Sequence, residues 1–408
     1  MLRFDPFSYE HHENPYPTYR QLRDRAPAYL DPERGFWALS RHEDVRAAID
    51  DWPTFSSSGG ITLERRTENV EPMLIEMDPP RHTELRSLVS RAFTPRRVAD
   101  LEEPTRALAL ELSEDFGPGR RLDVIGDFAA KLPMAVISVM LGVPRADQDE
   151  LREWSDAMLH REEGSADLTP AGIEGATRLY GYFNDVIAQR RRSPTDDLVG
   201  ALVAAEEDTA GGRPTDDGPE VALRGSSDRR SLSPAEVLGF CFLLLIAGNE
   251  TTTKLLGNAL FWLEAFPDQR ELLLADPTRI PGAVEETLRY DTSTQALARV
   301  LTRDVGLHGV TLPAGRKGLL LFGSANRDER RWDEPDRFDI DRNPAGHLAF
   351  GHGLHHCLGA PLARLETRVA LDVLLPRLGR YEVDSAAAER VHSGNVRGFA
   401  RLPVEIPT

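Results

Sequence analysis

The stretch FGHGLHHCLG, residues 350–359, decides how the rest of the chain is interpreted. It holds three glycines, three histidines and Cys357, one of the two cysteines in the chain. Glycine lacks a Cβ and therefore lets the backbone approach a large, flat ligand closely. A helical pattern, LGAPLARLETRVALDVLL, begins at Leu358, so Cys357 stands near a helix N-terminus, where the dipole and free N–H groups favour a thiolate. The stretch therefore predicts a thiolate that binds a metal.

Two kinds of metal centre could use this thiolate. A zinc site would combine Cys357 with histidines of the same region, which are His347, His352, His355 and His356. The spacing disfavours zinc, because three of these ligands are consecutive and the usual C-x₂₋₄-C partner is missing. A haem iron needs a single thiolate for oxygen activation, since the thiolate pushes electron density onto the iron and favours O–O cleavage. Haem is the better match, and zinc stays an alternative.

Composition narrows the class of protein. The 408 residues include 49 Lys and Arg against 66 Asp and Glu, which gives a formal charge of −17. This charge argues against nucleic-acid binding and against docking to anionic lipid. Two cysteines are too few for a disulfide framework, so a reducing cytoplasm fits. The longest apolar run, residues 237–248, is shorter than the ~20 residues of a membrane span, and the first twenty residues contain no apolar run that could serve as an anchor.

Periodicity predicts a mainly helical chain with a small β portion, and length alone favours two domains. Helical spacing extends over residues 124–141 and 148–159. Residues 208–231, rich in Gly, Asp, Ser and Arg, are predicted to be a disordered surface loop. The strand-like runs are Gly35–Leu39, Arg299–Val305, Lys317–Phe322 and Leu402–Ile406, with LPAG at 312–315 as a turn between the second and third.

A long helix with an interrupted middle follows the predicted loop. Ser233, Pro234 and Glu236 form a capping-box pattern, and helical periodicity continues to Phe266, before Pro267. The middle of this helix reads AGNETTT, residues 247–253. A glycine in a helix interior costs about 1 kcal/mol relative to alanine, and broken local rules often mark a functional site.

The AGNETTT segment has two interpretations. Ala247, Gly248 and Thr251 share one face and could form a groove beside a hydroxyl. Alternatively, Glu250 pairs with Lys254 at i+4, Thr251 bonds back to the Ala247 carbonyl, and Gly248 only allows close packing. The sequence by itself leaves both open.

These segments together resemble the cytochrome P450 family. FGxGxHxCxG, residues 350–359, is similar to its haem-binding signature, and AGNETT, residues 247–252, to its oxygen-groove motif. ETLR, residues 286–289, looks like its E-x-x-R pair because it lies between the long helix and the cysteine loop. The resemblance implies one P450 domain over residues 1–408, which overrides the expectation of two. It is mainly α with small β-sheets, a triangular prism of roughly a dozen helices around a buried haem b (iron protoporphyrin IX).

The resemblance also assigns roles to residues. Cys357 would be the axial ligand of the iron, and Thr251 and Glu250 would manage proton delivery, with Gly248 and Ala247 leaving room for oxygen. Glu286, Arg289 and Arg337 would form a structural network. The other cofactor-binding residues would be His82, Arg86, Arg299, His355, Phe350, Gly351 and Gly359. The alternative for His82 and Arg86 is an ordinary solvated helix face.

The segment after the E-x-x-R helix departs from the family pattern. Bacterial members usually read Tyr-Asp-x-Pro there, whereas this chain has Ser293 at the position of the proline. By resemblance this segment passes over the haem, so the path of the chain and the polarity of the pocket are affected. The predicted substrate pocket comprises Leu244, Ser293, Thr294, Gln295, Asn395 and Val396.

By resemblance the chain is a soluble bacterial haem-thiolate monooxygenase. It would insert one atom of O₂ into a C–H bond or alkene of an apolar small molecule, such as a secondary metabolite, steroid, terpenoid or fatty acid. Electrons would come from NAD(P)H through a ferredoxin reductase and a ferredoxin. The resemblance implies a cytoplasmic monomer without membrane anchor. Two alternatives stay open: a peroxide-using or non-oxidative haem-thiolate enzyme, and a haem-binding sensor without turnover.

Basic residues flank the predicted haem ligand in this acidic chain. They belong to the segments that form the face nearest the thiolate in the family, where a ferredoxin would dock. A local basic patch would attract an acidic partner. These residues are Arg91, Arg96, Arg97, Arg364 and Arg368.

Overall fold

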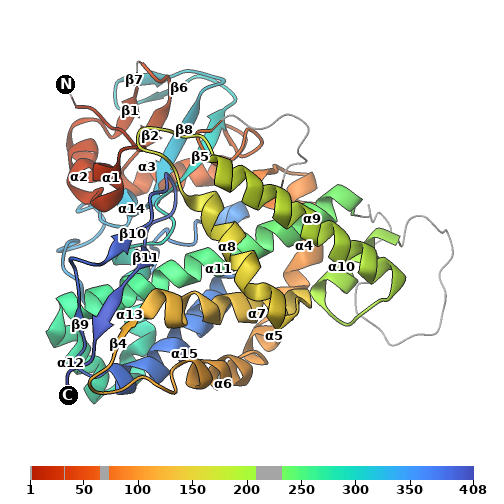
Figure 1. Ribbon diagram of the computed structural model, residues 1–408. Helices are drawn as coiled ribbons and strands as arrows, with labels where there is room; N and C mark the ends of the chain where they lie inside the picture. Colours follow the sequence, from red (N-terminus) through yellow and green to blue (C-terminus); the bar gives the residue numbers. More distant parts are fainter. Residues whose placement is uncertain (1, 32, 65–72, 208–231) are drawn as a thin grey trace.

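The computed structural model describes residues 2–31, 33–64, 73–207 and 232–408, and the predicted disordered loop at 208–231 lies outside these residues (Figure 1). Helices make up most of the described chain, which confirms the predicted class. The α-helices are α1 (Tyr9–Glu13), α2 (Tyr16–Arg25), α3 (His42–Asp50), α4 (Arg81–Val89), α5 (Pro95–Ala99), α6 (Glu102–Leu112), α7 (Lys131–Leu141), α8 (Gln148–Leu159), α9 (Pro170–Arg192), α10 (Leu198–Glu207), α11 (Pro234–Ala265), α12 (Pro267–Ala275), α13 (Ile280–Tyr290), α14 (Phe322–Ala325) and α15 (Ala360–Leu378). Short helical turns are η1 (Leu74–Glu76), η2 (Ser90–Phe93), η3 (Ile125–Ala129), η4 (Arg145–Asp147), η5 (Pro277–Arg279) and η6 (Gly353–His355).

Helix α11 crosses the middle of the molecule, and the other long helices pack around it (Figure 1). Its 32 residues span about 48 Å at ~1.5 Å per residue. The predicted cap is confirmed: the Glu236 N–H donates to Ser233 Oγ at 3.1 Å, and the Ser233 N–H donates to the Glu236 carboxylate at 2.8 Å. Among the described helices, α11 alone is long and apolar enough to span a membrane. Half of its most apolar window is buried within the structure.

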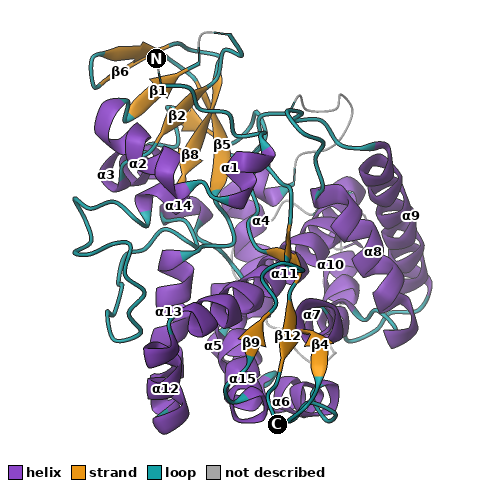
Figure 2. Cartoon of the chain, turned by 60° about the vertical axis from the view of Figure 1, so that its left-hand side comes forward, coloured by secondary structure: helices purple, strands orange, loops and turns teal. Residues whose placement is uncertain are grey.

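A five-stranded sheet forms one end of the molecule (Figure 2). Its strands lie in the order β1 (Ala28–Leu30), β2 (Trp37–Leu39), β8 (Lys317–Leu321), β5 (Ala296–Leu301) and β3 (Phe55–Ser56). β2 pairs with β8 in parallel, and the other pairs are antiparallel. The predicted strand at 299–305 was wrong in its bounds. β5 begins earlier and ends at Leu301, and the hairpin of β6 (Val305–Leu307) and β7 (Val310–Leu312) follows before the LPAG turn.

Two small sheets join the C-terminal segment to the helical part. β12 (Pro403–Glu405) lies between β4 (Arg121–Asp123) and β9 (Glu382–Val383), and all pairs are antiparallel. β10 (Glu389–Arg390) pairs with β11 (Phe399–Arg401). The turn between β10 and β11 carries the predicted pocket residues Asn395 and Val396 back toward β5.

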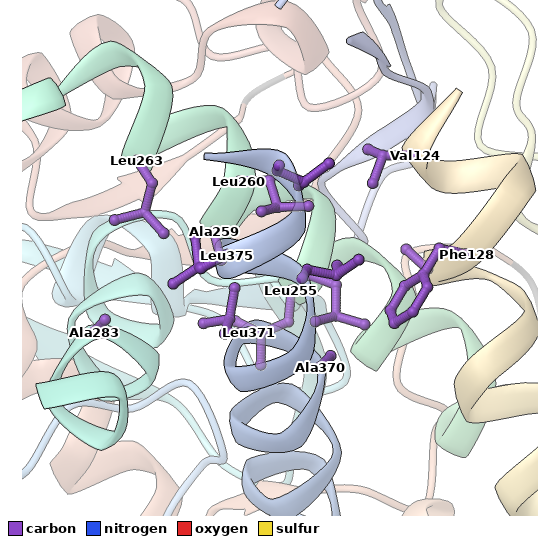
Figure 3. Packing of buried hydrophobic residues seen from close by; sticks show 14 of the residues in the cluster. Val124, Phe128, Leu255, Ala259, Leu260, Leu263, Ala283, Ala370, Leu371 and Leu375 are labelled. Atoms are coloured by element: carbon purple, nitrogen blue, oxygen red, sulfur yellow. The ribbon is translucent and has the colours of Figure 1, made fainter. Parts of the chain in front are cut away.

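The largest hydrophobic core lies where α11 meets α13, α15 and η3 (Figure 3). Leu255, Leu260 and Leu371 are buried, and so is Phe128, which η3 supplies. Each fully buried side chain of this size contributes about 1.5–3 kcal/mol relative to exposure. This core fixes the relative positions of α11 and α15. Helix α11 carries the AGNETTT segment, and α15 directly follows the cysteine loop.

A buried ion-pair network anchors α13. The side chains of Glu286 and Arg289 are both 0% exposed, and two Arg289 N–H groups donate to the carboxylate at 2.7 and 2.8 Å. The prediction that Arg337 completes this network was wrong. Its side chain is 57% exposed and pairs with Glu334, whereas Arg342 Nε donates to Glu286 Oε1 at 3.1 Å. Arg289 also binds the carbonyl oxygens of Asn326, Pro335 and Arg337.

Candidate functional site

The cysteine loop closes on itself immediately before α15. The Cys357 N–H donates to the Phe350 carbonyl at 2.8 Å. Gly351 and Gly353 have φ values of +66° and +58°, in the left-handed region where a side chain is strained, so the tight turn requires glycine. A Cβ placed on Gly359 would meet no atom of the described residues within 4 Å, its two chain neighbours aside, so there is open space on this side of the loop.

Cys357 and Cys241 differ in surroundings. Cys357 is accessible, whereas Cys241 is buried within α11. Although Cys357 is accessible, desolvation by the surrounding protein atoms raises the pKa of its thiol, and the N–H groups of Gly359 and Ala360 lower it, as do the guanidinium groups of Arg86 and Arg364. Burial raises the pKa of Cys241 to about 12. The stabilising N–H groups and cations beside Cys357 favour a thiolate once a metal binds the sulfur.

Basic side chains from three elements gather beside the cysteine loop. His82 of α4 is fully buried, and neither ring nitrogen has a hydrogen-bond partner among the described residues. Its ring centroid lies 4.3 Å from that of His355, whose Nε2 is 3.2 Å from Ser57 Oγ. Arg299 of β5 is 3% exposed and donates Nη1 to the Ala298 carbonyl at 2.7 Å. The prediction that these residues meet in space therefore agrees with the structure, and the solvated-face alternative for His82 does not.

The electrostatics of this basic cluster favour an acidic ligand. Burial, together with the neighbouring Arg299, His82 and Arg86, lowers the pKa of His355 to about 3. Burial also lowers the pKa of Arg299 to about 10. Asp78 is the nearby acid, and it is already bonded to Ser56 Oγ at 2.5 Å and the Ser57 N–H at 3.0 Å. Carboxylates of a bound ligand would accept hydrogen bonds from these side chains and offset the positive charges of Arg86 and Arg299.

The AGNETTT segment of α11 shows the bonds that its packing interpretation predicts. Thr251 Oγ1 donates to the Ala247 carbonyl at 2.7 Å. A Cβ on Gly248 would lie 3.1 Å from Ile137 Cδ1 of α7, so this glycine allows α7 and α11 to pack closely. The roles of Ala247, Gly248 and Thr251 toward oxygen stay predictions.

Glu250 lies in a buried polar cluster. Its side chain is 2% exposed, and Oε2 lies 3.3 Å from Nζ of Lys254, which is 3% exposed. Ser155 Oγ of α8 donates to Oε1 at 3.3 Å, and Asn249 Nδ2 donates to the same oxygen at 3.2 Å. Burial raises the pKa of Glu250, Lys254 lowers it, and Asp156 raises it.

The two predicted pocket segments lie side by side. Thr294 pairs with Val396, and the Gln295 N–H donates to the Asn395 carbonyl at 2.8 Å. Ser293 is 5% exposed, and its Oγ has no hydrogen-bond partner in the part of the chain that the structure describes. Leu244 is part-buried on α11, between two hydrophobic clusters. The segment with Ser293 in place of proline therefore lies beside the segment that connects β10 and β11.

Comparison with known proteins agrees with this arrangement. The model of the family described as Cytochrome P450 matches residues 279–399. Cytochrome P450 123, so named in Mycobacterium tuberculosis, is 46% identical over 410 residues, which cover 99% of this chain and 97% of that protein. The chain belongs to the cytochrome P450 family. This cytochrome P450 is also 39% identical to the vitamin D(3) 25-hydroxylase of Pseudonocardia autotrophica, over 98% of the chain and 96% of the relative.

Solved structures show the same fold. CYP109E1 of Bacillus megaterium, solved in complex with testosterone, superposes on the chain with a TM-score of 0.85 at 32% identity. The alignment covers 98% of this chain and 99% of that one. The family carries a haem-thiolate cofactor and acts on small molecules with O₂ and redox partner proteins.

The residues present fit a haem. Cys357 supplies one thiolate, Gly359 leaves open space beside it, and His82 offers two unpartnered ring nitrogens in the basic cluster. A haem brings two propionate carboxylates, which could accept hydrogen bonds from the side chains of this cluster. The zinc alternative finds no support, because no three His, Cys, Asp or Glu side chains of the described residues come together as metal ligands.

Sequence reasoning missed some residues of the site. The side chain of Arg342, and not that of Arg337, binds Glu286 in the buried ion-pair network, and the positions of the two arginines in the sequence do not show which of them reaches Glu286. Ser57 and Asp78 support the basic cluster from loops without a motif. Asp156 of α8 lies beside Glu250, and only the packing of α8 on α11 brings it there.

Proposed function

We propose that this cytochrome P450 is a haem b monooxygenase that hydroxylates or epoxidises an apolar small molecule, with electrons from a ferredoxin, as a cytoplasmic monomer. The observation that supports it most is one accessible cysteine at a helix start beside a buried basic cluster in which both ring nitrogens of His82 are unpartnered among the described residues. When bound, the haem-thiolate group activates O₂, so that one oxygen atom enters the substrate and the other leaves as water.

The protein's own residues bind the cofactor, deliver protons and shape the pocket. Cys357 binds the iron, and His82, Arg86, Arg299 and His355 bind the propionates. Arg86 also donates to the His356 carbonyl, which fixes the cysteine loop relative to α4. Thr251 donates or passes a proton through Oγ1, and Glu250 supplies that proton from the buried cluster. The segments around Ser293 and Asn395 form a wall of the substrate pocket.

A polycyclic, steroid-like substrate is the class that we propose. A relative is named as a vitamin D(3) 25-hydroxylase, and a structural neighbour was solved with testosterone. The Ser293 Oγ, which has no hydrogen-bond partner among the described residues, is a polar group of this wall that could bind one hydroxyl or carbonyl of such a skeleton. Vitamin D₃ and testosterone are therefore the first ligands to test by difference spectroscopy.

Dependence on electron supply tests the proposed function. With a ligand that shifts the spectrum, we expect product from NAD(P)H, a ferredoxin reductase, a ferredoxin and O₂, and little product from hydrogen peroxide alone. Turnover with peroxide alone would favour the peroxide-using alternative. Ligand binding without turnover under either condition would favour a sensor.

Thr251→Ala should uncouple the reaction while leaving folding and substrate binding nearly unchanged. The substitution removes one hydroxyl and its bond to the Ala247 carbonyl, so the cost to stability is about 0.5–1.5 kcal/mol. The product formed per NAD(P)H should fall severalfold, and hydrogen peroxide should rise, because protons reach oxygen less efficiently. Thr253→Ala is a matched control, since Thr253 bonds the Asn249 and Ala129 carbonyls and is buried. Unchanged coupling in Thr251→Ala would leave Thr251 as a packing residue.

Reduction by an acidic ferredoxin should depend on the basic residues near the haem ligand. Arg364 binds Glu285 at 2.6 and 3.0 Å, and Arg368 binds Glu102 at 2.7 Å, so these two are partly neutralised. Arg96 and Arg97 are exposed at the start of α5 and carry most of the expected attraction. Arg96→Glu with Arg97→Glu should slow reduction and flatten its dependence on ionic strength above ~0.15 M. An unchanged salt profile would place the docking surface elsewhere.

A further inference from the structure

A cavity of about 480 Å³ lies between α8, α11, η3 and the strands β10 and β11. Ile125, Leu159 and Val391 supply apolar surface, and charged side chains line much of the remainder. Its described lining residues include none of those assigned to the haem or to the substrate pocket. Binding sites for small molecules have volumes of about 300–1,000 Å³, so this cavity is large enough for a ligand of its own.

Arg390 of β10 is a buried cation in the wall of this cavity. Its side chain is 9% exposed, and its Nη1 has no hydrogen-bond partner in the described parts of the chain. The carboxylate beside it belongs to Asp291, whose Oδ2 lies 3.9 Å from Nη1, beyond the length of a hydrogen bond. The guanidinium lies over the ring of Phe399, 4.1 Å from its centroid. Buried polar groups are normally hydrogen-bonded, so Arg390 lacks an acceptor.

The Asp291 carboxylate is already bound by other donors. It accepts hydrogen bonds from Tyr16 Oη at 2.6 Å, Trp262 Nε1 at 2.9 Å and Arg397 Nε at 2.8 Å. Burial, together with the neighbouring Arg397, lowers the pKa of Arg390 to about 10, although Asp291 raises it. The charge on Arg390 is therefore poorly compensated by the protein, and an anion in the cavity would stabilise it.

Two further unpartnered nitrogens belong to residues that line the same cavity. Arg152 Nε of α8 and His392 Nδ1, two residues beyond Arg390, are buried without a hydrogen-bond partner within the described ranges. The third cation of the wall, Lys254, is different, because its Nζ lies 3.3 Å from the Glu250 carboxylate and is neutralised there. Arg390 and Arg152 are therefore the cations that are available to a ligand.

The acids of the cavity determine which anion can bind. Glu13, Asp156 and Glu389 also line it, and they are more exposed than Arg390: the side chain of Asp156 is 43% exposed and that of Glu389 is 65% exposed. Their repulsion disfavours a dianion such as phosphate more than an ion with one charge. A carboxylate carries one charge and matches the planar fork of a guanidinium with two parallel hydrogen bonds.

We propose that this cavity is a second ligand site, which binds a small apolar monocarboxylic acid with its carboxylate on Arg390. The apolar body of the ligand lies along Ile125, Leu159 and Val391, and Arg152 Nε is a further donor to the carboxylate. The site is separate from the haem and does not depend on the proposed monooxygenase reaction.

Isothermal titration calorimetry of the holoenzyme with decanoate tests this site. The haem pocket is first filled with 4-phenylimidazole, which binds the iron and whose Soret band shows whether it stays bound. We expect saturable binding of decanoate to this complex. Arg390→Met should weaken the binding by about 10–100-fold, because a charge-assisted pair is lost. Decanol, which has the same chain without the carboxylate, should bind the parent more weakly by a similar factor.

Arg401→Met is the matched control. Arg401 of β11 is 52% exposed, pairs with Glu389 at 3.8 Å and is not among the described residues that line the cavity, so its loss should leave the affinity within about twofold. Arg390→Met is expected to fold, since Asp291 keeps its three hydrogen bonds. If it does not fold, Arg152→Met replaces it, because the side chain of Arg152 is 29% exposed, and a severalfold loss is expected.

Decanoate binding that persists with 4-phenylimidazole bound, falls in Arg390→Met and is kept in Arg401→Met supports the site. Displacement of 4-phenylimidazole by decanoate would place the ligand in the haem pocket and overturn the inference. Parental affinity in Arg390→Met, or in Arg152→Met where that variant replaces it, would overturn it as well, as would equal affinity for decanol or no saturable binding. Each of these results leaves the proposed function unchanged.

Discussion

Cys357→Ser is expected to abolish the strongly red-shifted Soret band of the ferrous carbonyl form. A serine oxygen cannot supply the electron-rich sulfur ligand on which that band depends. The loop around Cys357 should persist, because it is closed by backbone bonds such as that from the Cys357 N–H to the Phe350 carbonyl. The purified variant should therefore bind less haem, or bind it with an ordinary Soret band.

Cys241→Ala is the matched control for this experiment. Cys241 is buried on α11, and burial keeps its thiol protonated, so it cannot act as the ligand. The control should keep the red-shifted band at the parental intensity. A Cys357→Ser protein that kept the band, or a Cys241→Ala protein that lost it, would contradict the assignment of the axial ligand.

Arg289→Met should destabilise the protein by about 3–5 kcal/mol, because it leaves the Glu286 carboxylate buried without its main partner. Arg342→Met should cost less, about 1.5–3 kcal/mol, since Arg289 still binds Glu286. Arg337→Met on the exposed side should change stability by no more than about 0.5 kcal/mol. Guanidinium unfolding followed by circular dichroism, together with haem content, measures this order.

The order of the three variants tests the corrected network directly. A large loss in Arg337→Met with a small one in Arg342→Met would restore the network expected from sequence resemblance. Equal, small losses in all three would show that the network is not a main source of stability.

Local signals in the sequence predicted local structure well. The capping box at Ser233 and the proline at 267 bound α11, and α8 has the bounds that its periodicity indicated. Helix caps and prolines act within a few residues, so they can be read from one segment. The strand at 299–305 was less well bounded, because pairing with β8 determines where β5 ends.

The parts of the site that belong to sequence motifs could be predicted. The loop with Cys357 and the meeting of His82 with His355 agree with the structure. Arg342 and Asp156 could not be found, since each reaches its partner through contacts between segments far apart in the chain. Gly248 shows a further limit of prediction from sequence. Close packing against Ile137 and space for oxygen would both require glycine at this position, so the residue type does not distinguish the two roles.

The most direct test of the central claim is the source of the oxygen atom in the product. The holoenzyme is supplied with NAD(P)H, ferredoxin reductase, ferredoxin, a ligand that shifts its spectrum, and ¹⁸O₂ in ordinary water. A monooxygenase should give product with one ¹⁸O atom per inserted oxygen, and the Cys357→Ser variant should give none. Product without the ¹⁸O label, whose oxygen then comes from water, would contradict the account.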